Sequence, residues 1–412
     1  SDAPGGRVAY CNGVDTCIWG GNGIPCAGFI TSTAAITDTP TNPMDYTEVM
    51  QNTRQDAENV AIIGGGNDAY TMVLIDFEEK AVADMKDTSS GGAGAHPAVL
   101  VGTADWTTDW AKFRTRSGKI LATGDGFSIA DHADLDWGAG HGAIDFWLVG
   151  HSGVSKYKTG SFTYASGTGK ITGVATDFAS FNVGDSFLVR KTGTTTYYGG
   201  HISAKAGDSS DITVVSNLTD GWALDYIHVS SALCGRYGDA TNYWYLAVAT
   251  SADTWLLCLA DGGAPTFYTI NNGNYDSTEV GKHIALVQNH TGPELSLYVA
   301  GVKTVIGAFE LPDLAAALVF GRCQWAAAAY AEGFQDTGLS FDEIRVSKGA
   351  YRWSVATISP PARPYGGQAL YWLVRSPVPL RGAKFYIVSG KGNATTSASA
   401  RSTRAGVPIV KT

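Results

Sequence analysis

Short apolar runs, each the length of a β-strand and each followed by turn residues, recur along most of this chain. In the second half, YWYLAVA, TWLLCLA, HIALVQN, LSLYVAG, ALVFGRCQW and SFDEIRVS follow one another at the spacing of about 8–12 residues that is typical of an antiparallel sandwich. In AIDFWL, Ile144, Phe146 and Leu148 alternate with Asp145 and Trp147, so the two sets should face opposite sides of a sheet. The pattern predicts an all-β fold.

Composition agrees with strands joined by tight turns. The chain has 51 Gly, 19 Tyr, 15 Phe and 11 Trp, and only 16% of its residues are charged. Its net charge of −9 disfavours nucleic acid and anionic membranes as partners. No run approaches the roughly 20 apolar residues that span a bilayer, so we expect no membrane insertion. The polar start, Ser1 to Arg7, does not read as a signal peptide.

Shifts in composition divide the chain into five parts. The segment between the two halves of the main domain is richer in Thr and Gly and poorer in Trp, and a small closed β-barrel fits it because closure removes exposed edges. We expect an N-terminal arm or small subdomain (1–70), a first part of a sandwich (71–155), an inserted small β domain (156–226), a second part of the sandwich (227–365) and a C-terminal extension (366–412).

Four segments resemble a known family. FSIADHADLDWGAGHGAIDFWL resembles the opening strands of laminin-G-like domains of the concanavalin A superfamily, and MVLIDFE resembles their first strand. GKHIALVQNHTGPELSLYVAGVKT is similar to their central hairpin, and FDEIRVSKGAYRWSVATISPPARPY to their closing strand. Gly281 and Lys282 stand where the family has Trp before its His, and Ala300 stands where it has Asp. The resemblance implies a concanavalin A-like antiparallel sandwich, or jelly roll.

The ending RVSKGAYR and the insertion look most like the versions found on bacteriophage tail and fibre proteins. This resemblance implies a structural virion component: a tail fibre, tail or capsid-decoration protein, located in the particle and without enzymatic activity. Its expected partners are other virion proteins, copies of itself in a homo-oligomer, and cell-surface polysaccharide bound by the sandwich. A stand-alone carbohydrate-binding lectin module and a polysaccharide-cleaving enzyme remain alternatives. The position in the virion and the symmetry stay open.

Two predicted loops, Arg236–Trp244 and Asn271–Asp276, carry aromatic and amide side chains of the kind that bind sugars. Aromatic rings stack on the C–H surfaces of sugars, and polar side chains form hydrogen bonds with their hydroxyls. The alternative for both loops is ordinary turn chemistry. The candidate glycan-binding residues are Asp239, Asn242, Trp244, Asn272 and Asn274.

Carboxylates offer the only candidates for catalysis. Asp145 with Asp342 and Glu343 would supply the acid and base that a glycosidase needs. The alternative, which we favour, is that Asp145 or Glu343 pairs with Arg345. No His lies in a metalloprotease motif, and His283 is expected on a strand.

Cofactor signals are weak. Asp131, Asp134 and Asp136 in ADHADLDWG could bind calcium, but they lack the regular spacing of an EF-hand loop and could equally cap turns. We therefore expect no cofactor, with calcium as the alternative.

The six cysteines form no zinc pattern. Cys258 and Cys323 are predicted to be small buried apolar residues. One disulfide among Cys11, Cys17 and Cys26 stays open, because geometry cannot be tested from the sequence.

Overall fold

The computed structural model divides into two compact units, one of Tyr70–Thr357 and one of Ser1–Ala69 with Ile358–Thr412. The N-terminal cysteines and both Asn272 and Asn274 lie outside the described residues, so the predictions made for them are not addressed. The structure describes residues 67–80, 84–122, 124–150, 157–174, 177–249, 254–271, 281–326, 329–332, 339–358, 360–361, 364–365, 384–388 and 394–399.

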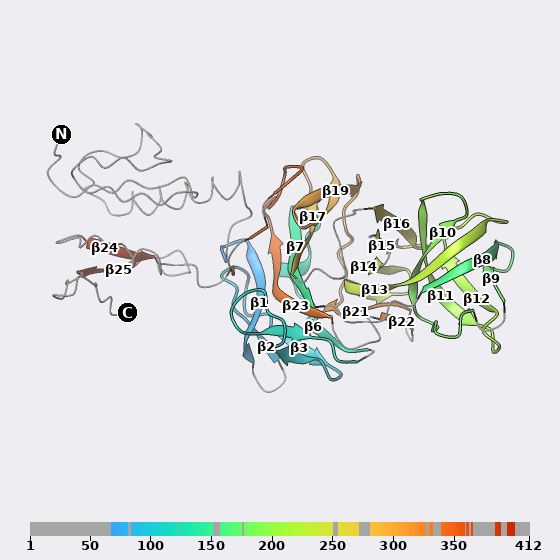
Figure 1. The fold of residues 1–412 in the computed structure, drawn as a ribbon. Coiled ribbons are helices and arrows are strands. Elements are labelled where there is room, and N and C mark those ends of the chain that lie inside the picture. The colour runs from blue at the N-terminus through green and yellow to red at the C-terminus, as the bar shows by residue number, and fades with distance from the viewer. Residues whose placement is uncertain are drawn as a thin grey trace, which may run out of the picture. The chain divides into compact units, whose positions relative to one another are not determined.

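The larger unit contains a sandwich of two antiparallel sheets (Figure 1). Every ladder in the first sheet joins neighbours in antiparallel register, and the order is β19-β18-β17-β7-β23-β1. These strands are β1 (Thr71–Lys80), β7 (Gly142–Gly150), β17 (Lys282–Asn289), β18 (Glu294–Val299), β19 (Val302–Gly307) and β23 (Ser340–Lys348).

The second sheet has the order β3-β6-β20-β13-β14-β15-β16. Its strands are β3 (Ala98–Val101), β6 (Gly126–Ile129), β13 (Ala223–Asp239), β14 (Asn242–Ala249), β15 (Thr254–Asp261), β16 (Thr266–Asn271) and β20 (Leu318–Phe320). β2 (Asp84–Asp87) pairs with both β1 and β3, and therefore links the two sheets.

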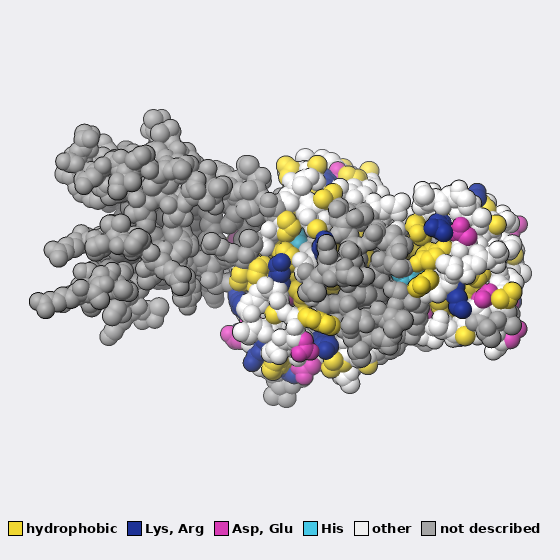
Figure 2. Space-filling view, viewed as in Figure 1, with side chains coloured by type: hydrophobic (Ala, Val, Ile, Leu, Met, Phe, Trp, Pro, Cys, Tyr) yellow, Lys and Arg dark blue, Asp and Glu magenta, His cyan; other side chains and the backbone are white. Residues whose placement is uncertain are grey.

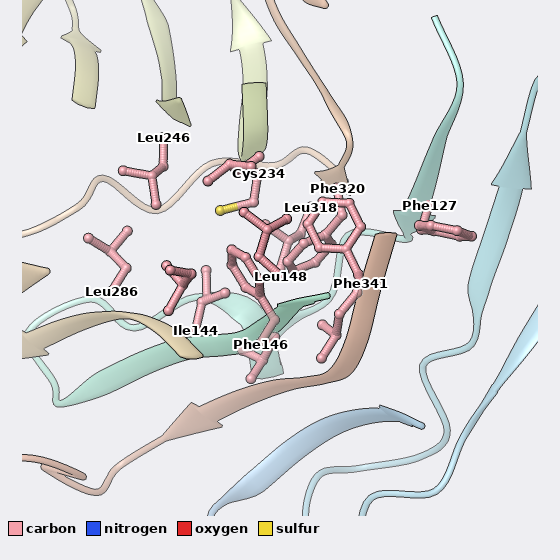
Figure 3. Packing of buried hydrophobic residues seen from close by; sticks show 14 of the residues in the cluster. Phe127, Ile144, Phe146, Leu148, Cys234, Leu246, Leu286, Leu318, Phe320 and Phe341 are labelled. Carbon is pink, nitrogen blue, oxygen red and sulfur yellow. The ribbon is translucent and has the colours of Figure 1, made fainter. Parts of the chain in front are cut away.

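One apolar interior lies between these sheets (Figure 3). Ile144, Phe146 and Leu286 enter it from the first sheet, while Leu246 and Phe320 enter it from the second. All five are at most 3% exposed, and burying one such side chain contributes about 1.5–3 kcal/mol. The predicted all-β sandwich is thus confirmed, and the alternation in AIDFWL predicted its inner face correctly.

Between β7 and β14, the chain forms a closed six-stranded barrel with the cyclic order β8-β9-β12-β11-β10-β13. Its own core includes Phe162, Phe187 and Ile227. The strands that complete the ring are β8 (Tyr157–Ala165), β9 (Lys170–Thr172), β10 (Ser186–Lys191), β11 (Tyr197–Lys205) and β12 (Asp211–Ser216). Every strand of the ring has two neighbours, which confirms the predicted barrel and leaves no free edge.

β13 belongs to both bodies. Its first half pairs with β8 and β10 in the barrel, and from Ser231 onward it pairs with β14 and β20 in the sandwich. Leu188 of the barrel packs with Tyr245 and Leu256 on the outer face of the second sheet. A Cβ at Gly199 would collide with Leu256, so this close approach requires glycine. The part of the second sheet formed by β13, β14, β15 and β16 is therefore covered on both faces.

Short elements complete the larger unit. A 3₁₀ helix, η1 (Ala133–Leu135), is the one helical element of the described residues, and among them no helix has the length or apolarity to cross a membrane. Cys258 and Cys323 are buried, as predicted. The remaining strands of this unit are β4 (Asp105–Thr107), β5 (Ser117–Lys119), β21 (Arg322–Ala326) and β22 (Ala329–Glu332).

The smaller unit contains one described hairpin. β24 (Lys384–Val388) pairs in antiparallel register with β25 (Ala394–Ser399). This hairpin lies within the region predicted to be a C-terminal extension. The five domain bounds stay predictions.

Candidate functional site

Asp145 is part of a closed ion cluster on the outer face of the first sheet. Its Oδ1 accepts a hydrogen bond from Nε of Arg345 at 2.9 Å, and Nε2 of His283 lies 3.3 Å from its Oδ2. The three side chains are fully buried. Burial alone would raise the pKa of Asp145, but the charge of Arg345 and the hydrogen bond with His283 outweigh it and hold this pKa below its ordinary value. The expected Asp145–Arg345 pair is confirmed, as is the strand position of His283.

Asp342 anchors a loop instead of a substrate. Its Oδ2 accepts the backbone N–H groups of Lys112 and Phe113 at 2.8 and 2.9 Å. Burial raises the pKa of Asp342 to about 6, although these two hydrogen bonds act in the opposite direction. Asp342 is 1% exposed and Glu343 is fully buried. A glycosidase needs carboxylates that reach a sugar across open space, so these three residues do not form such a site.

The aspartates of ADHADLDWG divide between two partners. Nη2 of Arg236 donates to Asp131 at 2.7 Å, and Nη1 donates to Asp136 at 2.8 Å. Asp134 instead lies 3.0 Å from Nε2 of His96. The guanidinium of Arg236 thus supplies the positive charge between Asp131 and Asp136 that a calcium ion would otherwise supply. Calcium at these aspartates, the alternative to no cofactor, stays an untested prediction.

The predicted glycan residues of the β13–β14 hairpin bind one another. Nδ2 of Asn242 donates to both carboxylate oxygens of Asp239, which also accepts from the backbone and the hydroxyl of Thr241. Trp244 is 2% exposed and points into the sandwich interior. Its ring therefore has no face for a sugar, and the prediction for this residue is wrong. Alternation alone could not decide which face of β14 is internal, since both faces are covered.

A small cavity lies beside Arg236 and Trp244 at the same end of the sandwich. Its walls include Trp137, Leu311 and Pro312, and its volume is about 10 Å³. That is the space of roughly one water molecule, so the cavity cannot hold a sugar ring.

The barrel carries a different set of aromatic and charged side chains, which we call the aromatic face: Tyr157, Tyr197, Tyr226, Arg190 and Asp225. β11, β10 and β13 place Tyr197, Arg190 and Tyr226 directly opposite one another in successive ladders. The rings of Tyr157 and Tyr226 stack at 5.9 Å with an interplanar angle of 28°. Tyr197 meets Tyr226 edge-on at 6.2 Å.

A charged pair, Arg190 and Asp225, lies beside these rings. The guanidinium of Arg190 lies 5.6 Å from the centre of the Tyr226 ring, and its Nε donates to Asp225 at 2.8 Å. Tyr157 is 52% exposed and Tyr226 is 9% exposed, so Tyr157 offers an accessible ring above a covered one. In Figure 2, hydrophobic side chains gather on the barrel together with Lys or Arg and Asp or Glu side chains.

Sequence reasoning missed this face. The tyrosines of TTTYYGGHI and LDYIHV are visible as strand residues, but they are far apart in the chain. Only the ladder register brings Arg190 between Tyr197 and Tyr226. Tyr226 alternates with the buried Ile227, which would place its ring outward, but it is also two residues from the buried Leu224, which would place it inward. The irregularity of the β13 ladder between Leu224 and Tyr226 causes this conflict, so alternation could not find the face.

The fold defines the class of this chain: an all-β sandwich that carries an inserted barrel. Comparison with known proteins gives no family, because no family model matches the sequence and no curated protein matches it either. Solved structures do match in shape, at low sequence identity.

Among them is the crystal structure of the botulinum neurotoxin serotype D binding domain, which is 12% identical with a TM-score of 0.35 and covers 69% of this chain. This chain spans 49% of that structure, about half its length. Domain 4 of AbnA, a GH43 extracellular arabinanase from Geobacillus stearothermophilus, in complex with arabinotriose, is 11% identical with a TM-score of 0.32; the match covers 69% of this chain and 95% of that one. The Ruminococcus gnavus IT-sialidase CBM40 bound to alpha2,3 sialyllactose is 11% identical with a TM-score of 0.28, covering 56% and 89%.

Proposed function

We propose that this chain is a non-catalytic, carbohydrate-binding adhesion protein of a bacteriophage particle, and that the aromatic face of the barrel binds the sugar. The observation that carries the proposal is the exposed ring of Tyr157, stacked on Tyr226 and placed near the Arg190–Asp225 pair.

The chemistry of the aromatic face suits a saccharide. The flat face of Tyr157 can cover the C–H surface of a pyranose ring, and the neighbouring Tyr226 fixes its orientation. Arg190 supplies N–H donors and Asp225 supplies acceptors, the two kinds of group that hydroxyls pair with. Because Arg190 and Asp225 are each about one third exposed, both can exchange water for a ligand.

The carboxylates that the sequence suggested for a hydrolase have structural partners instead. Asp145 neutralises Arg345 inside the protein, and Asp342 holds the backbone of Lys112 and Phe113. A protein that holds a saccharide without cutting it fits this arrangement better than a glycosidase does.

The test of sugar binding is a glycan array probed with the full chain, followed by titration with the best ligand. We expect Tyr157→Ala and Arg190→Gln each to weaken binding about tenfold, or ~1.4 kcal/mol. Tyr70→Ala is the matched control, because Tyr70 is 46% exposed and lies at the start of the sandwich. If no glycan binds, or if both variants bind like the wild type, the aromatic face is not the binding surface.

The virion part of the proposal is supported by the resemblance of the RVSKGAYR ending and the inserted domain to phage tail and fibre proteins. Repetition of one contact between copies of the chain would build it into the particle. Mass spectrometry of purified particles should detect the chain at a copy number that is a multiple of the particle symmetry. Its absence from purified particles would leave a stand-alone lectin as the better description.

A further inference from the structure

Two loops that are distant in the sequence bring two histidines and one aspartate together at the end of the sandwich. His96 lies between β2 and β3, while His132 and Asp134 lie at the start of η1. One ligand atom from each residue lies within 4.8 Å of the other two. Nε2 of His96 is 3.0 Å from Oδ2 of Asp134, and Nδ1 of His132 is 3.3 Å from the same oxygen.

These spacings match a coordination sphere. Nitrogen and oxygen ligands at about 2.0–2.1 Å from a tetrahedral Zn²⁺ are separated by about 3.3 Å. The two N–O separations, 3.0 and 3.3 Å, are therefore close to the edge length of such a tetrahedron, and the third separation is at most 4.8 Å. His132 is 40% exposed while His96 is 8% exposed, so the cluster opens to solvent on the side of His132, where a water molecule can take the fourth position.

Nδ1 of His132 has one lone pair, and in this structure it accepts the backbone N–H of Asp134 at 3.1 Å. The same nitrogen lies 3.3 Å from Oδ2 of Asp134. A metal bound through Nδ1 takes this lone pair and replaces the hydrogen bond to Asp134.

Neighbouring groups hold the cluster in place. The backbone N–H of Ala93 donates to Oδ2 of Asp134 at 2.7 Å, and the backbone N–H of His96 donates to Oδ2 of Asp87 at 2.7 Å. These backbone hydrogen bonds fix the positions of the Asp134 carboxylate and of His96, as the groups around a metal site do.

We propose that His96, His132 and Asp134 form a binding site for a first-row transition-metal cation, with Zn²⁺ as the reference ion. Two imidazole nitrogens and one carboxylate oxygen suit Zn²⁺, Cu²⁺ or Ni²⁺, whereas Ca²⁺ takes oxygen ligands. The site joins the β2–β3 loop to the turn that Arg236 holds through Asp131 and Asp136. A bound metal would therefore cross-link the β2–β3 loop to the η1 turn at this end of the sandwich.

The test is calorimetric titration of the full chain, without an affinity tag of histidines, with Zn²⁺ alone. His132→Asn and His96→Gln should each weaken one Zn²⁺ site by about 100-fold or more. Asn is a good helix cap, so His132→Asn should leave η1 in place, and a circular dichroism melt checks the fold of both variants. Because cysteine thiolates also bind zinc, the total number of bound Zn²⁺ ions does not identify the site. The quantity to compare is the Zn²⁺ affinity of the wild type and of each variant.

His290→Asn is the matched control, since His290 is also an exposed histidine beside a carboxylate, with its Nδ1 2.6 Å from Glu310. It should leave Zn²⁺ binding unchanged, and Ca²⁺ should not compete with Zn²⁺ in the wild type. Saturating Zn²⁺ should also raise the melting temperature of the wild type but not of His132→Asn. Equal Zn²⁺ binding by the wild type and both cluster variants, or an equal loss in the control, would overturn the proposal.

Discussion

The two ends of β23 each hold a buried carboxylate, and they stabilise it differently. Near its C-terminal end, Arg345 faces Asp145 of β7 and neutralises it with a full positive charge. Near its N-terminal end, Asp342 has backbone N–H dipoles, those of Lys112 and Phe113 among them, and no counter-charge is paired with it in the described residues. The pKa of Asp145 is accordingly held below its ordinary value, while burial raises the pKa of Asp342 to about 6.

The physical reason is that a full opposite charge offsets the burial of a carboxylate more than backbone hydrogen bonds do. Both carboxylates are at most 1% exposed, so both lose their hydration. A pair with divergent pKa values can mark an acid and a base in an enzyme. Here both members are buried against protein partners, and the divergence reports structural roles instead.

The largest effect should come from removing the counter-charge. Arg345→Met leaves Asp145 buried beside His283 without its arginine, and we expect a loss of about 3–5 kcal/mol in the free energy of unfolding, measured by urea denaturation. A loss below about 1 kcal/mol would mean that Asp145 does not depend on a buried counter-charge. Asp145→Asn in the same background should recover part of the loss.

The second effect concerns pH and has a definite sign. The folded pKa of Asp342 is about 6 and its ordinary value is 3.8, so the folded state binds this proton more tightly. The free energy of unfolding should therefore fall as the pH rises from about 4 to about 6, by up to about 3 kcal/mol, and then level off. Asp145 has the opposite sign, because its stabilising contribution is lost only as the pH falls below about 4.

Asp342→Asn isolates that contribution, since the amide oxygen can still accept the two N–H groups but cannot titrate. Urea denaturation between pH 4 and pH 7 should show a flatter profile for this variant than for the wild type. Identical profiles would show that Asp342 keeps an ordinary pKa in the folded protein.

The ion pairs of Arg236 are intermediate in burial between the Asp145–Arg345 pair and the surface pair Arg190–Asp225. Arg236 is buried, but its partners Asp131 and Asp136 are 41% and 32% exposed. Arg236→Met leaves carboxylates that water can reach, together with the carbonyls of Leu314 and Ala316. We expect a loss of about 2 kcal/mol in the free energy of unfolding, less than for Arg345→Met. A larger loss for Arg236→Met than for Arg345→Met would contradict this ranking by burial.

The smallest effect should occur at the surface. The Arg190–Asp225 pair is about one third exposed on both sides, and Arg190→Gln should lower the free energy of unfolding by less than about 1 kcal/mol in urea. The same variant is expected to weaken glycan binding about tenfold. A large loss of stability would make it unsuitable as a binding variant and would indicate a structural role for this pair.

Much of the fold was predictable because strand patterns are local. Runs such as MVLIDF, TWLLCLA and HIALVQN are strands in the structure, and the closed barrel lies where the composition changes. The site was less predictable. Trp244 looked like a sugar-binding ring, yet the barrel covers the outer face of β14 and the sandwich covers its inner face, so alternation no longer distinguishes solvent from core.

The sequence by itself determined which segments are strands and that Asp145 lies opposite to Ile144 and Phe146 on β7, because side-chain alternation depends only on the local backbone. The tertiary structure decided the partners. Glu343 adopts a positive φ of 50° at an irregularity in β23, which turns both Ile344 and Phe341 inward.

Long-range register made the other decisions. It placed Asp145 opposite Arg345 and Arg190 between two tyrosines, and the packing of two loops placed His96 beside His132. Such contacts depend on the pairing of segments far apart in the chain, and no local pattern of residues encodes that pairing.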